Sequence, residues 1–265
     1  MDAWILISKR GFKAWVKTRF FKLATHFAVY GQRGKQICIE KGINPERIAV
    51  VNNSLPCIRA GNAEYSAPLD EIRKFKASVF SQPQHPVIVW IGRLLEINRL
   101  ECLLVSACEL RRRNCPINVL IIGDGEAASS LSSLAEELGL NDNVHFAGAC
   151  YDESKIGLML SSSDLFVAPA RTGLSCIHAL SYGVPVLTSD NFDKQCPEHE
   201  AVLPGKTGFF FDHTEEGALV DAIKESLDKF SNTETRDLCR KTAYEMFSVE
   251  RHAERLLNAM MGKGK

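Results

Sequence analysis

Short apolar runs alternate with longer segments of helical periodicity along most of the chain. Five runs are rich in Val, Ile, Leu or Phe, and each of the first four precedes a segment whose apolar residues recur every three or four positions. Uniformly apolar strands that alternate with helices predict a parallel sheet covered on both faces. We expect strands at 86–92, 117–123, 143–148, 164–169, 184–189 and 209–211, and helices at 98–113, 125–139, 152–162, 173–182, 214–229, 233–246 and 249–261. This is the pattern of a doubly wound, Rossmann-like α/β domain.

The first 68 residues have a different organisation. Residues 9–24 alternate basic and apolar groups at helical spacing, and they precede an expected strand at 26–30. A helix that ends at Gly42 and a buried strand at 47–51 follow. The segment 52–68 is rich in Asn, Pro, Ser and Gly, so it is the best candidate for a linker.

Composition narrows the class of protein. The chain has 265 residues with 32 basic and 32 acidic side chains, so its charge gives no reason to expect a nucleic-acid partner. It contains no run of about 18 apolar residues, the length that spans a membrane. Its nine cysteines are scattered and odd in number, which argues against a disulfide framework or a zinc site. We expect reduced core thiols in a cytoplasmic protein.

The candidate chemistry lies at the carboxyl ends of the expected strands, where open parallel sheets bind ligands. Gly173 stands at a helix start, where bare backbone N–H groups and the helix dipole favour a phosphate. Arg93 and Arg171 also follow strands, and a guanidinium matches phosphate geometry. Each feature alone is more often ordinary turn chemistry or a solvated side chain than part of a ligand site. Their occurrence on successive strands favours an anionic, nucleotide-like ligand.

Four sequence blocks resemble the donor-binding half of retaining GT-B glycosyltransferases of the group 1, family 4 type. They are IGRLLEINRLECLLVSACEL, LIIGDGEAASSLSSLAEELGLNDNVHFAGAC, DLFVAPARTGLSCIHALSYGVPVLTSDNF and PGKTGFFFDHTEEGALVDAI, in continuous order from about residue 87 to 230. The resemblance implies a nucleoside-diphosphate sugar, linked to UDP or GDP, as donor substrate, and no cofactor. It also implies a second Rossmann-like domain that holds the acceptor.

The resemblance suggests a division of the chain. Residues 1–53 correspond to a remnant of the acceptor-side domain, 54–83 to a linker and lead-in helix, 84–230 to the donor-binding domain, and 231–265 to C-terminal helices. We therefore expect the N-terminal domain to be largely missing from this chain.

The resemblance also assigns expected roles to individual residues. The Gly92–Arg93 pair would lie at the donor diphosphate, with Arg93 as the catalytic residue. Three further groups would surround the donor: Gly123 and Asp124 beside the nucleotide, the backbone around His145 and Phe146 at the base, and the amides of Gly173 and Leu174 at the phosphates.

Two family positions carry unusual residues. The usual phosphate-binding lysine falls on Asn98, which cannot neutralise the leaving group. The paired glutamates, which the family uses for the donor sugar and the ribose, fall on Ala170 and His178. His178 could still bind a ribose hydroxyl or be an ordinary helix residue, and Arg171 could supply the charge that Asn98 lacks. No Asp-x-Asp stands near a strand end, so we expect no essential metal ion.

The predicted function is transfer of a sugar to an acceptor hydroxyl with retention of configuration, in bacterial surface polysaccharide or glycolipid biosynthesis. The alternative is a donor-binding subunit or a truncated, inactive glycosyltransferase fragment that needs a partner chain. An epimerase of the same fold fits the blocks less well. The expected partners are a nucleotide sugar, a sugar or lipid-linked acceptor, and either a separate acceptor-domain chain or a second copy. Residues 1–24 could lie on the inner face of the membrane or form the last helix of the missing domain.

Overall fold

The computed structural model describes residues 16, 19, 23–58 and 67–261. The basic helix expected at 9–24 lies almost entirely outside these residues, so it remains a prediction. Among the described residues, no helix combines the length and the apolar character needed to cross a membrane.

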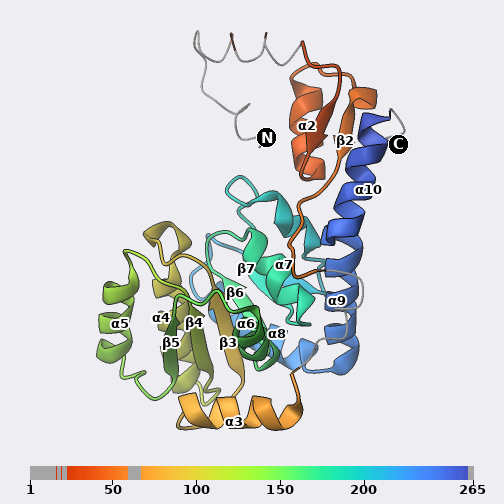
Figure 1. Cartoon of the computed structure of the whole chain (residues 1–265). Coiled ribbons are helices and arrows are strands. Elements are labelled where there is room, and N and C mark those ends of the chain that lie inside the picture. Colours follow the sequence, from red (N-terminus) through yellow and green to blue (C-terminus); the bar gives the residue numbers. More distant parts are fainter. Residues whose placement is uncertain (1–15, 17–18, 20–22, 59–66, 262–265) are drawn as a thin grey trace.

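A parallel sheet of six strands forms the centre of the molecule (Figure 1). Its order is β5-β4-β3-β6-β7-β8, so the chain starts in the middle, winds outward to β5, and returns to add β6, β7 and β8 on the other side. This order confirms the predicted doubly wound α/β fold. The strands are β3 (Val87–Ile91), β4 (Asn118–Ile122), β5 (Val144–Gly148), β6 (Leu165–Ala168), β7 (Val186–Ser189) and β8 (Gly208–Phe211).

Helices cover both faces of this sheet, because right-handed crossovers change face where the winding direction reverses. α4 packs against α5 and α8, whereas α7 packs against α9 and α3 packs against α6. α4 buries Leu100, Leu103, Leu104 and Leu110, which recur at the spacing of one helix face. The helices are α3 (Leu69–Val79), α4 (Leu100–Arg112), α5 (Ala128–Glu137), α6 (Glu153–Ser161), α7 (Leu174–Ser181), α8 (Ala218–Phe230), α9 (Thr233–Phe247) and α10 (Val249–Met260).

A smaller strand–helix–strand unit precedes the main sheet. β1 (Phe27–Val29) and β2 (Ile48–Val50) pair in parallel and are joined by α2 (Gln32–Glu40) and a short 3-10 helix, η2 (Pro45–Arg47). The unit has its own small apolar cluster, which includes Val29 and Cys38. The predicted elements are therefore present.

The smaller unit contacts the segment that follows β7 in the chain. The carboxylate of Glu200 accepts hydrogen bonds from the backbone N–H groups of Gln32 and Arg33, at 2.9 and 3.0 Å. Arg33 also forms an ion pair with Asp193 at 2.6 Å. α10 runs alongside β2, and His252 Nδ1 lies 3.1 Å from the carbonyl oxygen of Val51 (Figure 1). The smaller unit thus lies at the edge of the sheet where the strands end.

Several local features differ from the prediction. The helices expected from residues 125 and 214 begin at Ala128 and Ala218. The helix expected from residue 98 begins only at Leu100, because Arg99 adopts a left-handed conformation with φ of 54° after the 3-10 helix η3 (Glu96–Asn98). A further 3-10 helix, η4 (Pro197–Ala201), lies in a segment without a predicted element. The nine cysteines, all of which the structure describes, form no disulfide, but only three of them are fully buried, so the expected core position holds for three of the nine.

Candidate donor site at the sheet edge

The turns after β3, β4 and β5 are linked by backbone hydrogen bonds. Gly92 N donates to Ile122 O at 2.9 Å, and Gly123 N donates to Gly148 O at 2.8 Å. A Cβ atom on Gly123 would lie 1.9 Å from the carbonyl oxygen of Gly92, and Gly123 has a φ of 146°. The close approach of two turns therefore requires glycine at position 123, independently of any ligand.

Arg93 extends from a well-anchored loop. The side-chain amide of Asn98 donates to Arg93 O at 2.8 Å, and Leu94 N donates to Asp124 O at 3.0 Å. The Arg93 side chain is exposed, and within the described residues its guanidinium has no hydrogen-bond or ion-pair partner. The buried Asn98 thus serves the loop backbone, while the cation of Arg93 is available to an anion.

The residues predicted to bind the donor after β4 and in β5 have mainly structural contacts. Asp124 is exposed, and its Oδ1 accepts a hydrogen bond from Gly125 N at 2.7 Å. Burial lowers the pKa of His145, whose ring meets Phe80 edge-on at 6.4 Å. Phe146 is half-buried against the core. The side chain of His145 therefore packs as a structural residue, and a contact between this backbone and a base remains a prediction.

The start of α7 leaves its first amides without a side-chain cap. Gly173 is the N-cap residue, it has no capping side chain, and the first turn contains no acidic residue. Leu174, the first helical residue, is 41% exposed. Such an uncapped helix start has the partial positive charge that favours an anion.

The turn before α7 is fixed by a buried glutamine that sequence reasoning missed. Gln195 Oε1 accepts from Thr172 N at 2.8 Å, and Gln195 Nε2 donates to Ser189 O at 2.7 Å. Ser189 Oγ donates to the carbonyl oxygen of Ala170 at 2.7 Å. Arg171 is half-buried and has no hydrogen-bond or ion-pair partner among the described residues.

The sheet brings Arg93 and the start of α7 to adjacent strands. β3 and β6 are neighbours, with Ile88 opposite Leu165 and Val89 opposite Phe166. The turn that carries Arg93 and the turn that precedes α7 therefore follow neighbouring strands. The helices after these strands lie on opposite faces, so the two turns flank the switch point at which open α/β sheets bind ligands.

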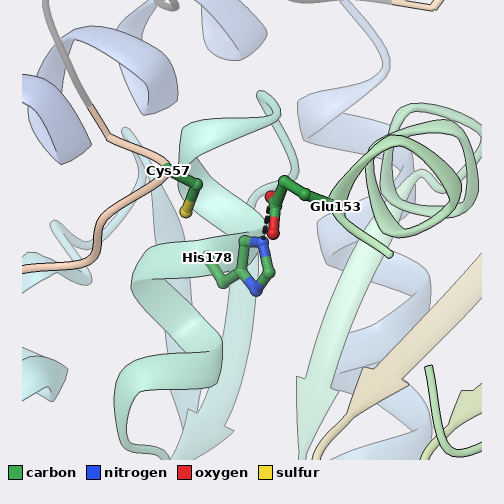
Figure 2. Close-up of side chains that lie close together, drawn as sticks. All are labelled: Cys57, Glu153 and His178. Carbon is green, nitrogen blue, oxygen red and sulfur yellow. Dashed lines mark hydrogen bonds and ion pairs between the residues drawn. The ribbon is translucent and has the colours of Figure 1, made fainter. Parts of the chain in front are cut away.

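His178 lies one helical turn after Leu174 on α7, and its side chain is only 14% exposed. Its Nε2 atom lies 2.8 Å from Glu153 Oε1, and the hydroxyl of Tyr182 donates to the same oxygen at 2.6 Å (Figure 2). Cys57, from the segment after β2, completes this group. Glu153, Tyr182 and Cys57 had no signal in the sequence, because they come from separate segments.

Within the part of the chain that the structure describes, two groups of side chains have ligand atoms close enough to share a metal ion. They are Cys57 with Glu153 and His178, and Asp190 with Asp212 and His213, each within 4.8 Å. Both groups hold internal hydrogen bonds, such as the one of 2.6 Å between His213 Nδ1 and Asp190 Oδ1. Burial and the neighbouring Glu153 carboxylate raise the pKa of Cys57 to about 12, so this thiol is protonated at neutral pH.

A pocket of about 730 Å³ lies between α4 and the segment after β8. It reaches Pro169 at the end of β6 and is lined by Arg99, Phe211 and His213, among others. None of the predicted donor-site residues lines it.

Relatives of the chain are glycosyltransferases. It is 28% identical over 171 residues to the GDP-mannose-dependent alpha-(1-6)-phosphatidylinositol monomannoside mannosyltransferase of Mycolicibacterium smegmatis, covering 61% of this chain and 44% of that protein. It is 24% identical over 184 residues to glycogen synthase of Halorhodospira halophila, covering 65% of this chain and 38% of that protein. The matched region thus spans less than half of these relatives.

Solved structures share the fold. The structure of Anabaena Alr3699/HepE in complex with UDP aligns with a TM-score of 0.76 at 18% identity, over 97% of this chain and 70% of that one. The apo lipopolysaccharide outer core galactosyltransferase WaaB aligns with a TM-score of 0.71 at 18% identity, over 91% of this chain and 63% of that one. The family profile of the glycosyl transferases group 1 matches residues 71–246, well over half of the chain. The chain therefore belongs to the glycosyl transferases group 1 family.

Proposed function

We propose that this chain binds a nucleoside-diphosphate sugar at the switch point between β3 and β6 and transfers the sugar to an acceptor hydroxyl with retention of configuration. The observation that carries this proposal is the exposed guanidinium of Arg93, which has no partner among the described residues, in the turn after β3, together with the uncapped start of α7 after the neighbouring strand β6. Both are positive features on fixed turns. The family of the chain supports sugar transfer from a nucleotide sugar.

The difficult step in this reaction is departure of the nucleoside diphosphate. The bond between the anomeric carbon and the phosphate oxygen breaks, and negative charge develops on the diphosphate. Preorganised donors stabilise such charge because they need no reorganisation during the reaction. Arg93 would supply charge and a bidentate hydrogen bond, and the amides of Leu174 and Ser175 would supply helix-start donors.

We assign the remaining donor contacts in the same way. Arg171 lies in the turn that leads into α7 and would add positive charge on the β6 side. His178, one helical turn after Leu174, lies on the same face of α7 and would bind a ribose hydroxyl. The acceptor would be a sugar or a lipid-linked sugar, in surface polysaccharide or glycolipid biosynthesis.

One observation favours the alternative, a donor-binding chain that does not transfer sugar by itself. At the position of the family's lysine, the side-chain amide of Asn98 donates to the carbonyl oxygen of Arg93. This side chain brings no charge to a leaving group. Under this alternative the chain binds the nucleotide but needs a partner chain for turnover.

The test is calorimetric binding of UDP and GDP, and of their glucose and mannose conjugates, to wild type and to R93A. We expect R93A to weaken diphosphate binding by about 10- to 100-fold, the effect of a lost charge-assisted contact. R112A is a matched control, because Arg112 is exposed on α4 and pairs with Glu109. Equal affinity in wild type and R93A would refute the assignment. Turnover assays then separate the two candidates, and the anomeric configuration of any product tests retention.

A further inference from the structure

Three hydrogen-bond donors converge on the carboxylate of Glu153. His178 and Tyr182 come from α7 and its end, at 2.8 and 2.6 Å from the same oxygen atom, Oε1. Cys57 approaches from the segment after β2, so three separate parts of the chain meet at this carboxylate (Figure 2). Glu153 is the first residue of α6, where the helix start also favours a negative charge.

The state of this carboxylate determines the tautomer of His178. Burial acts to raise the pKa of Glu153, but the hydrogen bonds from His178 and Tyr182, together with the charge that His178 carries when protonated, outweigh it, so the pKa lies below its ordinary value. At neutral pH Glu153 is therefore ionised and can only accept hydrogen bonds. The proton between Glu153 and His178 must then belong to Nε2. A neutral imidazole protonated at Nε2 carries its lone pair on Nδ1.

The Nδ1 atom of His178 remains available for another contact. Among the described residues it has no hydrogen-bond partner, and in Figure 2 it lies on the side of the ring away from Glu153. Side chains on a helix lean toward its N-terminus. His178 therefore leans toward Leu174 and the uncapped amides that precede it.

We propose that Glu153 is a positioning residue, which holds His178 as the tautomer that presents Nδ1 as a hydrogen-bond acceptor to a ribose hydroxyl of the donor. This inference rests on the proposed function. Held in this way, an imidazole offers a hydroxyl an acceptor and no donor, as a carboxylate would. Glu153 then acts on the donor through the imidazole.

The first experiment observes the tautomer directly, in the full chain without ligand. The nitrogen chemical shifts of the His178 ring, assigned by comparison with H178Q, distinguish Nε2–H from Nδ1–H. We expect Nε2–H in wild type and in Y182F, which keeps the Glu153–His178 contact. In E153Q we expect a mixture of tautomers, because a glutamine amide can both donate and accept. An Nδ1–H ring in wild type, or an unchanged ring in E153Q, would overturn the proposal.

The second experiment links the tautomer to the ribose. Binding of UDP and GDP is compared with binding of their 2′,3′-dideoxy analogues. We expect wild type and Y182F to favour the ribose forms by about three- to tenfold, the effect of one hydrogen bond. E153Q and H178A should each lose this preference, and the double variant should lose no more than either single variant. Additive losses, or a preference retained in E153Q, would contradict the positioning role.

The two proposals fail in different ways. R93A should weaken the ribose and dideoxy forms equally, since it acts on the diphosphate. If wild type binds none of these nucleotides, the proposed function fails and the donor role of His178 fails with it. If wild type binds them and R93A weakens binding, but E153Q keeps the ribose preference, only the role of Glu153 is refuted.

Discussion

Arg93 and Asn98 have different roles in the loop that follows β3. The side-chain amide of Asn98 donates a hydrogen bond to the backbone of the loop, at the carbonyl oxygen of Arg93. The guanidinium of Arg93 is exposed and has no partner among the residues that the structure describes. Position 123 requires glycine, because the carbonyl group of Gly92 occupies the space that a Cβ atom would fill. At the scale of single residues, the candidate site thus depends on packing and loop geometry as much as on charge.

The thiol of Cys57 reports on the group around Glu153. Burial and then the Glu153 carboxylate raise its pKa to about 12, so at about pH 8 roughly one thiol in ten thousand is ionised. Since the thiolate is the nucleophile, alkylation of Cys57 by iodoacetamide should be slow and should rise about tenfold per pH unit between about pH 8 and 10. E153Q removes the neighbouring charge and should accelerate the reaction at about pH 8.

Mass spectrometry of the peptide that contains Cys57 measures this rate, and C57S confirms the assignment. The same chain unfolded in urea serves as the reference for an unperturbed thiol. If Cys57 reacts equally fast in the folded and the unfolded chain at about pH 8, its environment has been misjudged.

At the scale of elements, the regular structure was predictable and the junctions were not. β3 and β4 are runs of apolar residues, so their strands and their parallel pairing follow from local pattern. The break at Arg99 depends on the Asn98 side chain reaching back to the Arg93 carbonyl, which no periodicity reveals.

The same limit applies to the candidate site. Arg93 and Gly173 were predicted as site residues because they follow strands, and the fold places strand ends together. Glu153 and His178 are 25 positions apart on different helices, and Gln195 reaches Thr172 from an irregular segment. Such contacts depend on how elements pack together, so they became visible only in three dimensions.

Two glycines at the carboxyl ends of β4 and β5 allow the cost of a steric clash to be distinguished from the cost of a left-handed backbone. Both have positive φ, 146° at Gly123 and 69° at Gly148, but only Gly123 faces a neighbour, since a Cβ on Gly148 meets nothing within 4 Å. G148A should therefore cost about 1–2 kcal/mol of unfolding free energy, the strain of a left-handed alanine. G123A must separate two turns and should exceed about 4 kcal/mol or abolish folding.

Urea unfolding followed by circular dichroism gives both values on one scale. G148A serves as the control for backbone strain alone. Equal destabilisation by the two substitutions would mean that the turns after β3 and β4 can move apart, and the rigidity assigned to the Arg93 loop would then be wrong.

At the scale of the whole molecule, side chains of η4 connect the smaller unit to the part of the chain that forms the main sheet. The carboxylate of Glu200 caps the start of α2, and the side-chain amide of Asn53 donates to Glu198 Oε1 at 3.0 Å. Both glutamates belong to η4, which follows β7 in the chain. This short 3-10 helix thus positions the smaller unit beside the strand ends that carry the candidate site.

The cap at α2 allows the strength of this connection to be measured. Glu200 accepts two backbone hydrogen bonds, so E200A should destabilise the smaller unit by about 1–3 kcal/mol. Hydrogen exchange should show faster exchange at the amides of Gln32 and Arg33 and along α2, with the six-stranded sheet unchanged.

D193A is the matched control, because it removes only the Arg33 ion pair, whose Asp193 side chain is 88% exposed. Exposed pairs contribute about 0.2–1 kcal/mol, so D193A should leave α2 nearly as protected as in wild type. Equal effects of the two substitutions would show that charge holds the units together, whereas faster exchange in the main sheet of E200A would show that the two units unfold together.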